Sequence, residues 1–524
     1  MTDSNHIDVV IVGAGHNGLV SAAYLSKSGL KVLLLEASNK VGGAATTSEF
    51  SEGFSVSECA HFLYSLHPTI VKDLQLADHG LSYAATDLET IALSSDGKHI
   101  RIAGSVIQGE DVTPSDIDNY RQFHAQMKRF AKVLATTFAD RPPRLVNNDM
   151  KDKMSLLKLG WNARKMGKQE MQELLRIGAI NIYDVLNENL DNQLLKGALS
   201  LEAVLGSHTG PRSPNTVLGL LYRRVGETFG FNGPAIPTGG MGNVSNAIAS
   251  SATSLGATIR TGSRVERILI QEQKVAGVEL DNGEIINCSR VISNADPKST
   301  FSKLVGYPQL ETGFSRRAAN IRMKGNTAKL HLALDALPEF AGLNANDIGS
   351  RLVIAPDPDY VESAFNHAKY GEFSEHPIME ISIPSVHDTS LAPAGKHVLS
   401  AVVQYAPHNL KQGWSEANNE FKALLIDLLE SYAPGLKKLI VDSELLSPAD
   451  FESRFGTTAG HWHHGELALD QFLMLRPFPG MSQYTTPIGG LFLCGAGCHP
   501  GGNVMGLVGR NCANTLLEVG ATSD

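Results

Sequence analysis

The stretch Ile7–Glu36 constrains the fold more than any other part of this chain. It begins with the apolar, β-branched run Ile7–Val12, which is typical of a parallel strand that is buried on both faces. Gly13, Gly15 and Gly18 follow with the spacing GxGxxG. Glycines at this spacing allow a tight turn, a close approach of backbone to a pyrophosphate, and close packing of a helix on the strand. The pattern predicts a strand, a phosphate-binding turn and a helix.

A second strand and an acid complete this unit. The helix is expected to end near Ser28-Gly29, and Val32–Leu35 then form a strand with Glu36 at its carboxyl end. A carboxylate there can accept hydrogen bonds from the ribose hydroxyls of an adenosine, and it would repel a 2′-phosphate. The N-terminus of the helix offers free N–H groups to the phosphates. Together these features predict a site for an unphosphorylated dinucleotide.

Composition excludes several classes of protein. A chain of 524 residues is too long for one ordinary domain, so we expect two interleaved domains. The net charge of -9 gives no support to a nucleic-acid partner. Five scattered cysteines are typical of a reducing compartment, and no targeting sequence or apolar run of membrane-spanning length is visible. We therefore expect a cytoplasmic protein, with membrane association left open.

Cys494 and Cys498, with His499 beside them, raise the question of a metal site. No second Cys/His pair at zinc-like spacing completes the ligand set, and the neighbouring glycines suit a cofactor loop better. We expect no metal, and we assign both cysteines a structural role.

A second glycine pair, Gly42-Gly43, follows the acid closely. It resembles the extended fingerprint of the flavoproteins with two dinucleotide-binding domains, in which the pair lies over the pyrophosphate of FAD. NAD dehydrogenases do not usually carry it, although an ordinary Gly-Gly loop explains the pair equally well when it is considered alone.

The nucleotide-binding pattern returns at residues 237–242, where a glycine-rich turn opens another helix. Thr258–Arg260 is then expected to form a parallel strand, and residues 265–270 and 275–280 to form a hairpin meander. Because Val265 follows the third parallel strand, we expect its backbone to lie against the adenine.

Between these parts lies a helical region that begins at Pro114-Ser115-Asp116 with capping residues and runs to about Leu205. Its segment 151–171 combines basic side chains with leucines, methionines and a tryptophan. Such a segment could lie on an anionic bilayer surface, or it could be an ordinary surface helix with its apolar side on the core. Residues 300–445 show the alternation of a mixed sheet with one face covered.

The C-terminal stretch resembles the second FAD fingerprint of the same flavoproteins. Leu491–Cys494 is expected to form a strand, Gly495 to turn the backbone toward the ribityl phosphate, and residues 503–506 to open a final helix. The N–H groups of Val504 and Met505 would then point at the pyrimidine edge of the flavin. No acid stands at the strand end, so a carboxylate contact to the ribityl chain is not assumed.

GAGHNGL and VGGAATT near the N-terminus, with LFLCGAGCHPGGNVMG and GRN near the C-terminus, resemble the phytoene desaturase superfamily. Within it the chain is similar to the branch of the β-carotene ketolases and the pyridine nucleotide-disulfide oxidoreductase domain-containing protein 2 group. The resemblance implies an α/β, Rossmann-like FAD fold with two dinucleotide-binding domains, an interleaved mixed α+β substrate domain and a helical insertion. The FAD-binding domain would comprise 1–105, 236–298 and 451–524, with a helical and substrate-domain insertion at 106–235 and the substrate domain with its mixed sheet at 299–450.

The same resemblance implies an FAD-dependent oxidoreductase, such as a desaturase, ketolase or dehydrogenase. Its hydrophobic isoprenoid, carotenoid or acyl-chain substrate would transfer a hydride to flavin N5. His61 and His463 are candidates to line the cavity, and alternation along an extended chain predicts that His461 and His463 converge while His464 points away. Two alternatives remain open, namely an FAD-dependent amine or small-molecule oxidase and an FAD-containing interaction or chaperone-like protein without turnover.

Overall fold

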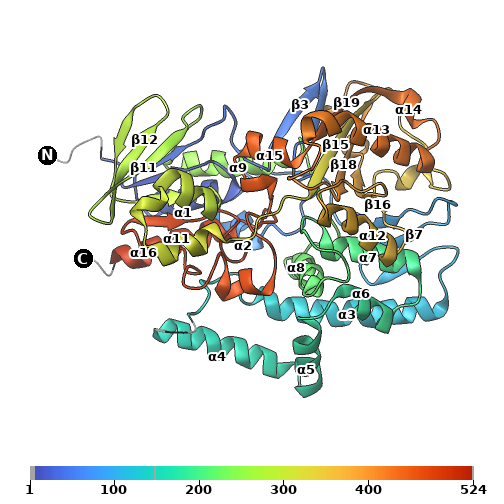
Figure 1. Ribbon diagram of the computed structural model, residues 1–524, viewed down its shortest axis with the longest axis horizontal. Helices are drawn as coiled ribbons and strands as arrows, with labels where there is room; N and C mark the ends of the chain where they lie inside the picture. Colours follow the sequence, from blue (N-terminus) through green and yellow to red (C-terminus); the bar gives the residue numbers. More distant parts are fainter. Residues whose placement is uncertain (1–5, 145, 147–148, 522–524) are drawn as a thin grey trace.

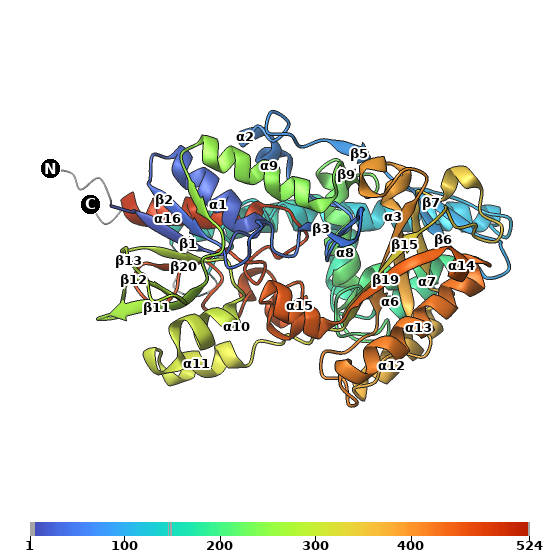
Figure 2. The ribbon, with the colours of Figure 1, turned by 90° about the horizontal axis from the view of Figure 1, so that it is seen from above.

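Two β-sheets occupy opposite ends of the computed structural model, which describes residues 6–144, 146 and 149–521 (Figure 1). One is a five-stranded sheet of order β10-β2-β1-β14-β20, and the other is an eight-stranded sheet of order β19-β15-β18-β17-β16-β6-β7-β8. Both chain ends lie at the five-stranded side (Figures 1 and 2).

The five-stranded sheet is parallel throughout and is assembled from segments far apart in the sequence. Its strands are β1 (Val9–Val12), β2 (Val32–Leu35), β10 (Thr258–Arg260), β14 (Val291–Ser293) and β20 (Leu491–Leu493). Val10 of β1 pairs with Leu33 on one side and with Val291 on the other. Every residue of β1 and β2 is buried, as the continuous apolar runs predicted. The predicted Rossmann-like α/β fold is confirmed.

Different layers cover the two faces of this sheet (Figure 2). On one face pack helices α1 (His16–Lys27), α9 (Met241–Ser254) and α16 (Leu507–Ala521). On the other face packs a three-stranded antiparallel sheet of β11 (Val265–Gln271), β12 (Lys274–Leu280) and β13 (Ile285–Asn287). Alternate residues of β1 therefore point into different cores, because neighbouring side chains of a strand face opposite sides.

The eight-stranded sheet is mostly antiparallel. Its strands are β6 (Thr90–Ala92), β7 (Ile100–Ala103), β8 (Val106–Gln108), β15 (Thr327–Leu334), β16 (Arg351–Ile354), β17 (Ile378–Ser382), β18 (His397–Gln404) and β19 (Ile440–Leu446). Helix α13 (Trp414–Tyr432) packs on one face. On the other side lie α3 (Pro114–Ala135), α6 (Ile182–Asn189), α7 (Gln193–Val204), α8 (Thr216–Thr228) and α12 (Pro358–Lys369).

Two expectations about this sheet were wrong. Strands β6 and β7 fall within 1–105, the range expected for the first FAD-binding segment, yet β6 pairs with β16 of the eight-stranded sheet. The sheet was also expected to have one covered face, whereas β15 is buried at every position. Its polar residues Lys329 and His331 are buried because the segment 47–59 covers them: Lys329 bonds to the carbonyls of Ser57 and Cys59, and the ring of His331 lies against Phe50. Alternating polarity here marks a buried polar layer, not a solvated face.

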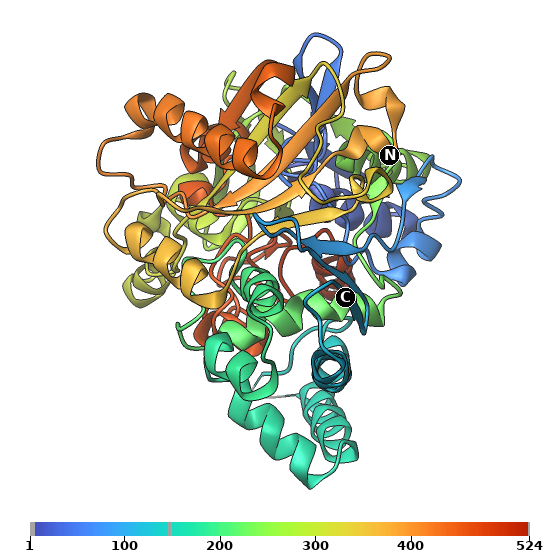
Figure 3. The same cartoon turned by 90° about the vertical axis from the view of Figure 1, so that its right-hand side faces the viewer.

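The helical insertion forms as predicted. Thr113 and Asp116 make a capping box ahead of α3, in which each side chain bonds the other's backbone N–H. Helices α4 (Met150–Lys165) and α5 (Lys168–Ile177) extend away from the rest of the molecule (Figure 3). Among the described residues, no helix combines the length and the apolar character needed to cross a membrane.

Shorter elements connect these layers. They are β3 (Thr47–Ser51), β4 (Phe54–Ser57), α2 (Pro68–Asp73), β5 (Tyr83–Ala85), β9 (Ile236–Pro237), α10 (Pro297–Ser299), α11 (Thr312–Ala319), α14 (Leu436–Leu439) and α15 (Pro448–Phe455).

Close packing of α1 on β1 predicts the effect of adding one methyl group at Gly18. A Cβ there would lie 2.2 Å from the carbonyl oxygen of Gly13. Gly18→Ala should therefore lower the stability of the folded protein by roughly 1–3 kcal/mol, measured as a fall in the thermal unfolding midpoint. Gly160→Ala on α4 is the control, since a Cβ at Gly160 meets open space and should be neutral or slightly stabilising. An unchanged midpoint for Gly18→Ala would contradict the packing argument.

Candidate functional site

A cavity of about 760 Å³ runs from the carboxyl ends of β1 and β2 to the inner face of the eight-stranded sheet. Most of the residues predicted to bind the cofactor line it, namely Gly13, Gly15, Glu36, Gly42, Gly43, Val265 and Val504. Gly18, Gly495 and Met505 lie behind this lining. Both candidate histidines, His61 and His463, also line the cavity. The structure therefore brings the N-terminal, middle and C-terminal motifs to one continuous space.

Glu36 is held in a fixed position at one end of this cavity. One carboxylate oxygen accepts a hydrogen bond from the N–H of Ala14 at 2.7 Å, and the other accepts from the N–H of Ser38 at 2.8 Å. Each oxygen keeps a second lone pair. The free lone pairs suit the two hydroxyls of a ribose, as the sequence predicted.

The glycine pair after Glu36 forms a close backbone cradle. Gly42 and Gly43 have φ angles of 121° and 56°, which favour glycine. A Cβ on Gly42 would also lie 2.7 Å from the carbonyl oxygen of Ala45. The pair lies beside Gly15, since the N–H of Gly42 bonds to the carbonyl of Ala14 at 2.8 Å. This backbone cradle is better explained as a pyrophosphate site than as an ordinary Gly-Gly loop.

The C-terminal fingerprint differs from its prediction in one respect. The final helix α16 begins at Leu507, not at residues 503–506. Asn503 and Val504 instead adopt left-handed backbone conformations with φ of 69° and 53°. This turn is held from outside, because Ser65 donates to the carbonyl of Asn503 at 2.9 Å.

The N–H groups of Val504 and Met505 have no hydrogen-bond partner among the described residues, although both residues are buried. Buried N–H groups are rarely left unpaired in native proteins. Val504 lines the cavity and Met505 follows it directly, so two such donors fit the acceptor atoms of a flavin pyrimidine ring. The chemistry expected of Val504 and Met505 is thus available from a turn, without a helix N-terminus.

Arg476 fixes the loop that precedes this fingerprint. Its fully buried guanidinium donates to the carbonyls of His463 at 2.6 Å, Ala496 at 2.9 Å and Gln471 at 3.1 Å. It also donates to the carbonyls of Gly465 and Glu466. Burial lowers the pKa of Arg476. One side chain therefore joins the histidine loop to the second fingerprint. In the sequence, only the presence of an arginine pointed to this role.

The histidine loop is a turn, so the prediction that His464 points away was wrong, although the rings of His461 and His463 do lie close together, with 6.1 Å between their centres. The N–H of His464 bonds to the carbonyl of His461 at 2.9 Å, and His464 has a positive φ of 53°. As a result His463 and His464 both line the cavity. The Nε2 atom of His461 lies 3.1 Å from Glu466 Oε1 instead.

The two candidate histidines of the cavity are neutral at physiological pH. Burial lowers the pKa of His61 to about 4 and the pKa of His463 well below its ordinary value. They can offer hydrogen bonds but carry no charge to the cavity. Among the described residues, no group of three His, Cys, Asp or Glu side chains could hold a metal ion. Cys494 and Cys498 are buried free thiols whose pKa values are raised by burial.

The inner end of the cavity is polar, which the sequence analysis did not foresee. Glu380 on β17 accepts hydrogen bonds from Arg351 Nε at 2.6 Å and from the hydroxyl of Tyr64 at 2.7 Å. Its other oxygen lies 3.2 Å from His61 Nε2. The only signal was a charged residue at an alternate position of a predicted strand, which is equally typical of a solvated face.

Lys329 is a second buried charge at this end of the sheet. Its Nζ donates to the carbonyls of Ser57 at 2.6 Å and Cys59 at 2.7 Å, and burial lowers its pKa to about 7. Cys59 lines the cavity. Lys329 thus anchors the segment after β4 to the eight-stranded sheet.

Comparison with known proteins gives matches along nearly the whole chain. The family of flavin containing amine oxidoreductases matches residues 18–514. Pyridine nucleotide-disulfide oxidoreductase domain-containing protein 2 of Rattus norvegicus is 34% identical, with 98% of this chain and 93% of that protein covered. A phytoene desaturase (lycopene-forming) of Pseudescherichia vulneris is 26% identical, with 97% and 98% covered.

Among solved structures, cyclohexylamine oxidase from Brevibacterium oxydans is similar with a TM-score of 0.58 and 15% identity. The likeness covers 98% of this chain and 100% of that chain. At this identity the match supports the fold.

The lowered pKa of Lys329 predicts a pH dependence of stability. Above about pH 7 the folded state has lost the proton that the unfolded state keeps until about pH 10.4. Stability should therefore rise with pH in this range. Between about pH 7 and pH 9, the wild type should gain roughly 2 kcal/mol relative to Lys329→Met.

The measurement is the free energy of unfolding of both proteins at several pH values. The absolute cost of the substitution does not matter, because the comparison concerns the two slopes. Parallel slopes for wild type and Lys329→Met would show that Lys329 does not titrate in this range.

Proposed function

We propose that this chain, a member of the flavin containing amine oxidoreductase family, oxidises a substrate with an apolar carbon skeleton. Within that family it belongs to the phytoene desaturase superfamily, in the branch with pyridine nucleotide-disulfide oxidoreductase domain-containing protein 2. The chain is an FAD-dependent oxidoreductase, and the proposal concerns what it oxidises. The observation that carries it is the single cavity that joins the dinucleotide end at Glu36 to the enclosed inner end at Glu380.

The inner end offers both apolar surface and neutral polar groups to a substrate. Phe62, Val402 and Trp462 supply apolar side chains, while His61 and His463 line the same space without charge. Burial of carbon against these groups excludes water and holds a C–H bond in a fixed place. FAD, when bound, supplies the hydride acceptor. The relative named phytoene desaturase supports an isoprenoid, carotenoid or acyl-chain substrate for this chain.

An amine substrate is the second candidate, favoured by the likeness to cyclohexylamine oxidase. A buried ammonium group is held most strongly by a carboxylate that has no other charged partner. Glu380 lines the inner end, but Arg351 already neutralises it at 2.6 Å. This arrangement favours a substrate without a cationic group.

We expect the visible absorption of the oxidised flavin to bleach anaerobically when the protein meets its substrate. Polyenes, monocyclic terpenes and acyl chains should be compared with primary amines of similar size, because the inner end holds no free carboxylate. Bleaching by an apolar compound supports the proposal, and its rate should fall at least tenfold in His463→Leu if that residue positions the substrate. Bleaching by amines alone would refute the proposal.

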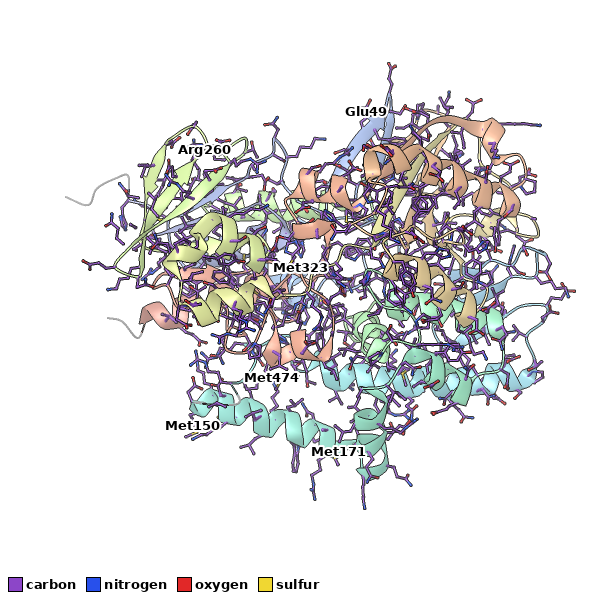
Figure 4. All side chains as sticks on the ribbon, viewed as in Figure 1. Glu49, Met150, Met171, Arg260, Met323 and Met474 are labelled. Atoms are coloured by element: carbon purple, nitrogen blue, oxygen red, sulfur yellow. The ribbon has the colours of Figure 1, made fainter. Side chains whose placement is uncertain are left out.

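We also propose that helix α4 rests on an anionic bilayer surface. Met150, Met154, Leu157 and Trp161 form a stripe along one face, and they are exposed to solvent, Leu157 by 73% and Trp161 by 60%. Figure 4 shows Met150 at the start of this helix and Met171 on α5, on the part that extends outward. Exposed apolar stripes of this kind commonly bind partners or membranes.

Basic side chains border the apolar stripe on the same helix. They are Lys151, Lys153, Lys158, Arg164 and Lys165. The protein as a whole carries a net charge of -9, so this local excess of positive charge stands out. An apolar stripe flanked by lysines matches an anionic lipid surface, to which each basic residue near the membrane contributes about 1 kcal/mol. A bilayer would also be a natural source of apolar substrate.

The holoprotein should float with vesicles that contain anionic phosphatidylglycerol and much less with neutral phosphatidylcholine vesicles. Leu157→Ser together with Trp161→Ser should abolish flotation, because both side chains would insert into the interface. Tyr370→Ser removes an equally exposed apolar group elsewhere and serves as the control. The wild type could instead fail to bind vesicles and form a concentration-dependent dimer that the double substitution converts to a monomer. That result would show that the stripe binds a second copy of the chain.

A further inference from the structure

Arg223 on helix α8 is an arginine without a hydrogen bond at the inner end of the cavity. It lines the cavity, and its side chain is only 14% exposed. None of its five N–H donors finds a hydrogen-bond partner among the described residues, and its Nη1 atom is fully enclosed. Its guanidinium lies 5.0 Å from the ring centre of Tyr64. The plane of this group is thus supported on one side while its donors remain unused.

The carboxylates near Arg223 are already bound by other groups. Glu380, whose Oε2 lies 3.8 Å from Arg223 Nη1, takes hydrogen bonds from Arg351 and Tyr64. Glu202 accepts from Arg351 at 2.8 Å and from Arg224 at 3.1 Å. Glu380 and Glu202 therefore take their hydrogen bonds from other side chains, and Arg223 makes no hydrogen bond to either of them.

The arrangement differs from that of a structural arginine. Arg351 and Arg224 each make short ion pairs with two acids. Arg476, the other fully buried arginine of the site, spends its donors on five carbonyls. Arg223 resembles neither, since it faces the cavity with a rigid fork of donors. A planar guanidinium of this kind binds a carboxylate in a bidentate manner.

We propose that Arg223 binds a carboxylate of the substrate, so that the substrate is an acid with an apolar carbon skeleton. The carboxylate lies on Arg223 against the edge of Tyr64, and the apolar part extends along Phe62 and Val402 toward the flavin end. Glu380 does not repel it, because Arg351 neutralises that carboxylate. This inference deepens the proposed function and rests on it for the position of the reacting carbon.

The test measures binding, not turnover. Decanoate is titrated into the flavin-loaded protein by calorimetry, with 1-decanol and decanamide as uncharged ligands of the same length. Wild type should bind decanoate at least tenfold more tightly than either uncharged ligand. Arg223→Met should remove this preference and leave the affinity for 1-decanol unchanged, and Arg223→Lys should restore part of it as a point charge. Arg212→Met is the control, since it removes an exposed arginine that forms an ion pair with Asp359, and it should bind all three ligands as the wild type does.

Three results would overturn the inference. If the wild type binds decanoate and decanamide with equal affinity, Arg223 does not select a carboxylate and only donates hydrogen bonds to neutral acceptors. Loss of FAD affinity in Arg223→Met, with the decanoate preference intact, would assign its donors to the flavin. If decanoate binds as expected but only apolar compounds without a carboxylate bleach the flavin, the proposed function stands and the inference that the substrate is an acid fails. If no apolar compound of any kind bleaches the flavin, the proposed function fails while the carboxylate subsite stands.

Discussion

The guanidinium of Arg476 is the interaction on which the geometry of the site depends. It holds five backbone carbonyls, three in the histidine loop at 463–466, one at Gln471 and one at Ala496 in the second fingerprint. Most of these carbonyls would otherwise be buried without a donor, which is costly in a protein interior. Because the arginine satisfies them together, His463 and the turn at Val504 keep fixed positions in the cavity. A positive charge that no carboxylate neutralises is stabilised here by the dipoles of carbonyl groups.

Burial of polar groups governs the other half of the molecule as well. The eight-stranded sheet turns Lys329, His331 and Glu380 toward the cavity side, where no solvent reaches them. Such groups persist only when they are paired, and most of them are, through Arg351, Tyr64 and the carbonyls after β4. Arg223 and His331 are exceptions, since neither Nη1 of Arg223 nor either ring nitrogen of His331 makes a hydrogen bond among the described residues. The cavity is therefore apolar in part and strongly polar at its inner end, whereas the resemblance to desaturases implied only a hydrophobic substrate.

Local sequence patterns predicted the backbone turns and strand ends at the Glu36 end of the cavity, because these features depend on residue spacing. Gly13, Gly42 and Glu36 act through turns, close approaches and strand ends, and these follow from spacing alone. The inner end could not be predicted in the same way. Tyr64, Arg223 and Glu380 come from three distant segments, and in the sequence each looks like an ordinary surface residue. At His461–His464 the alternation rule for extended chains was applied to a turn. The positive φ of His464 places this residue in the cavity lining, where the rule had it pointing away.

The parallel sheet has a consequence for how the protein is made. Its central strand β1 is synthesised first, but its neighbour β14 and the edge strand β20 come from much later parts of the chain. The turn at Val504 and the clamp of Arg476 follow later still than β14. A nascent chain can thus form the first glycine turn early, yet it cannot enclose a cofactor until the final segment has left the ribosome. The sheet at the FAD end thus depends on pairing between strands that lie far apart in the sequence, and such long-range pairing is slow to form.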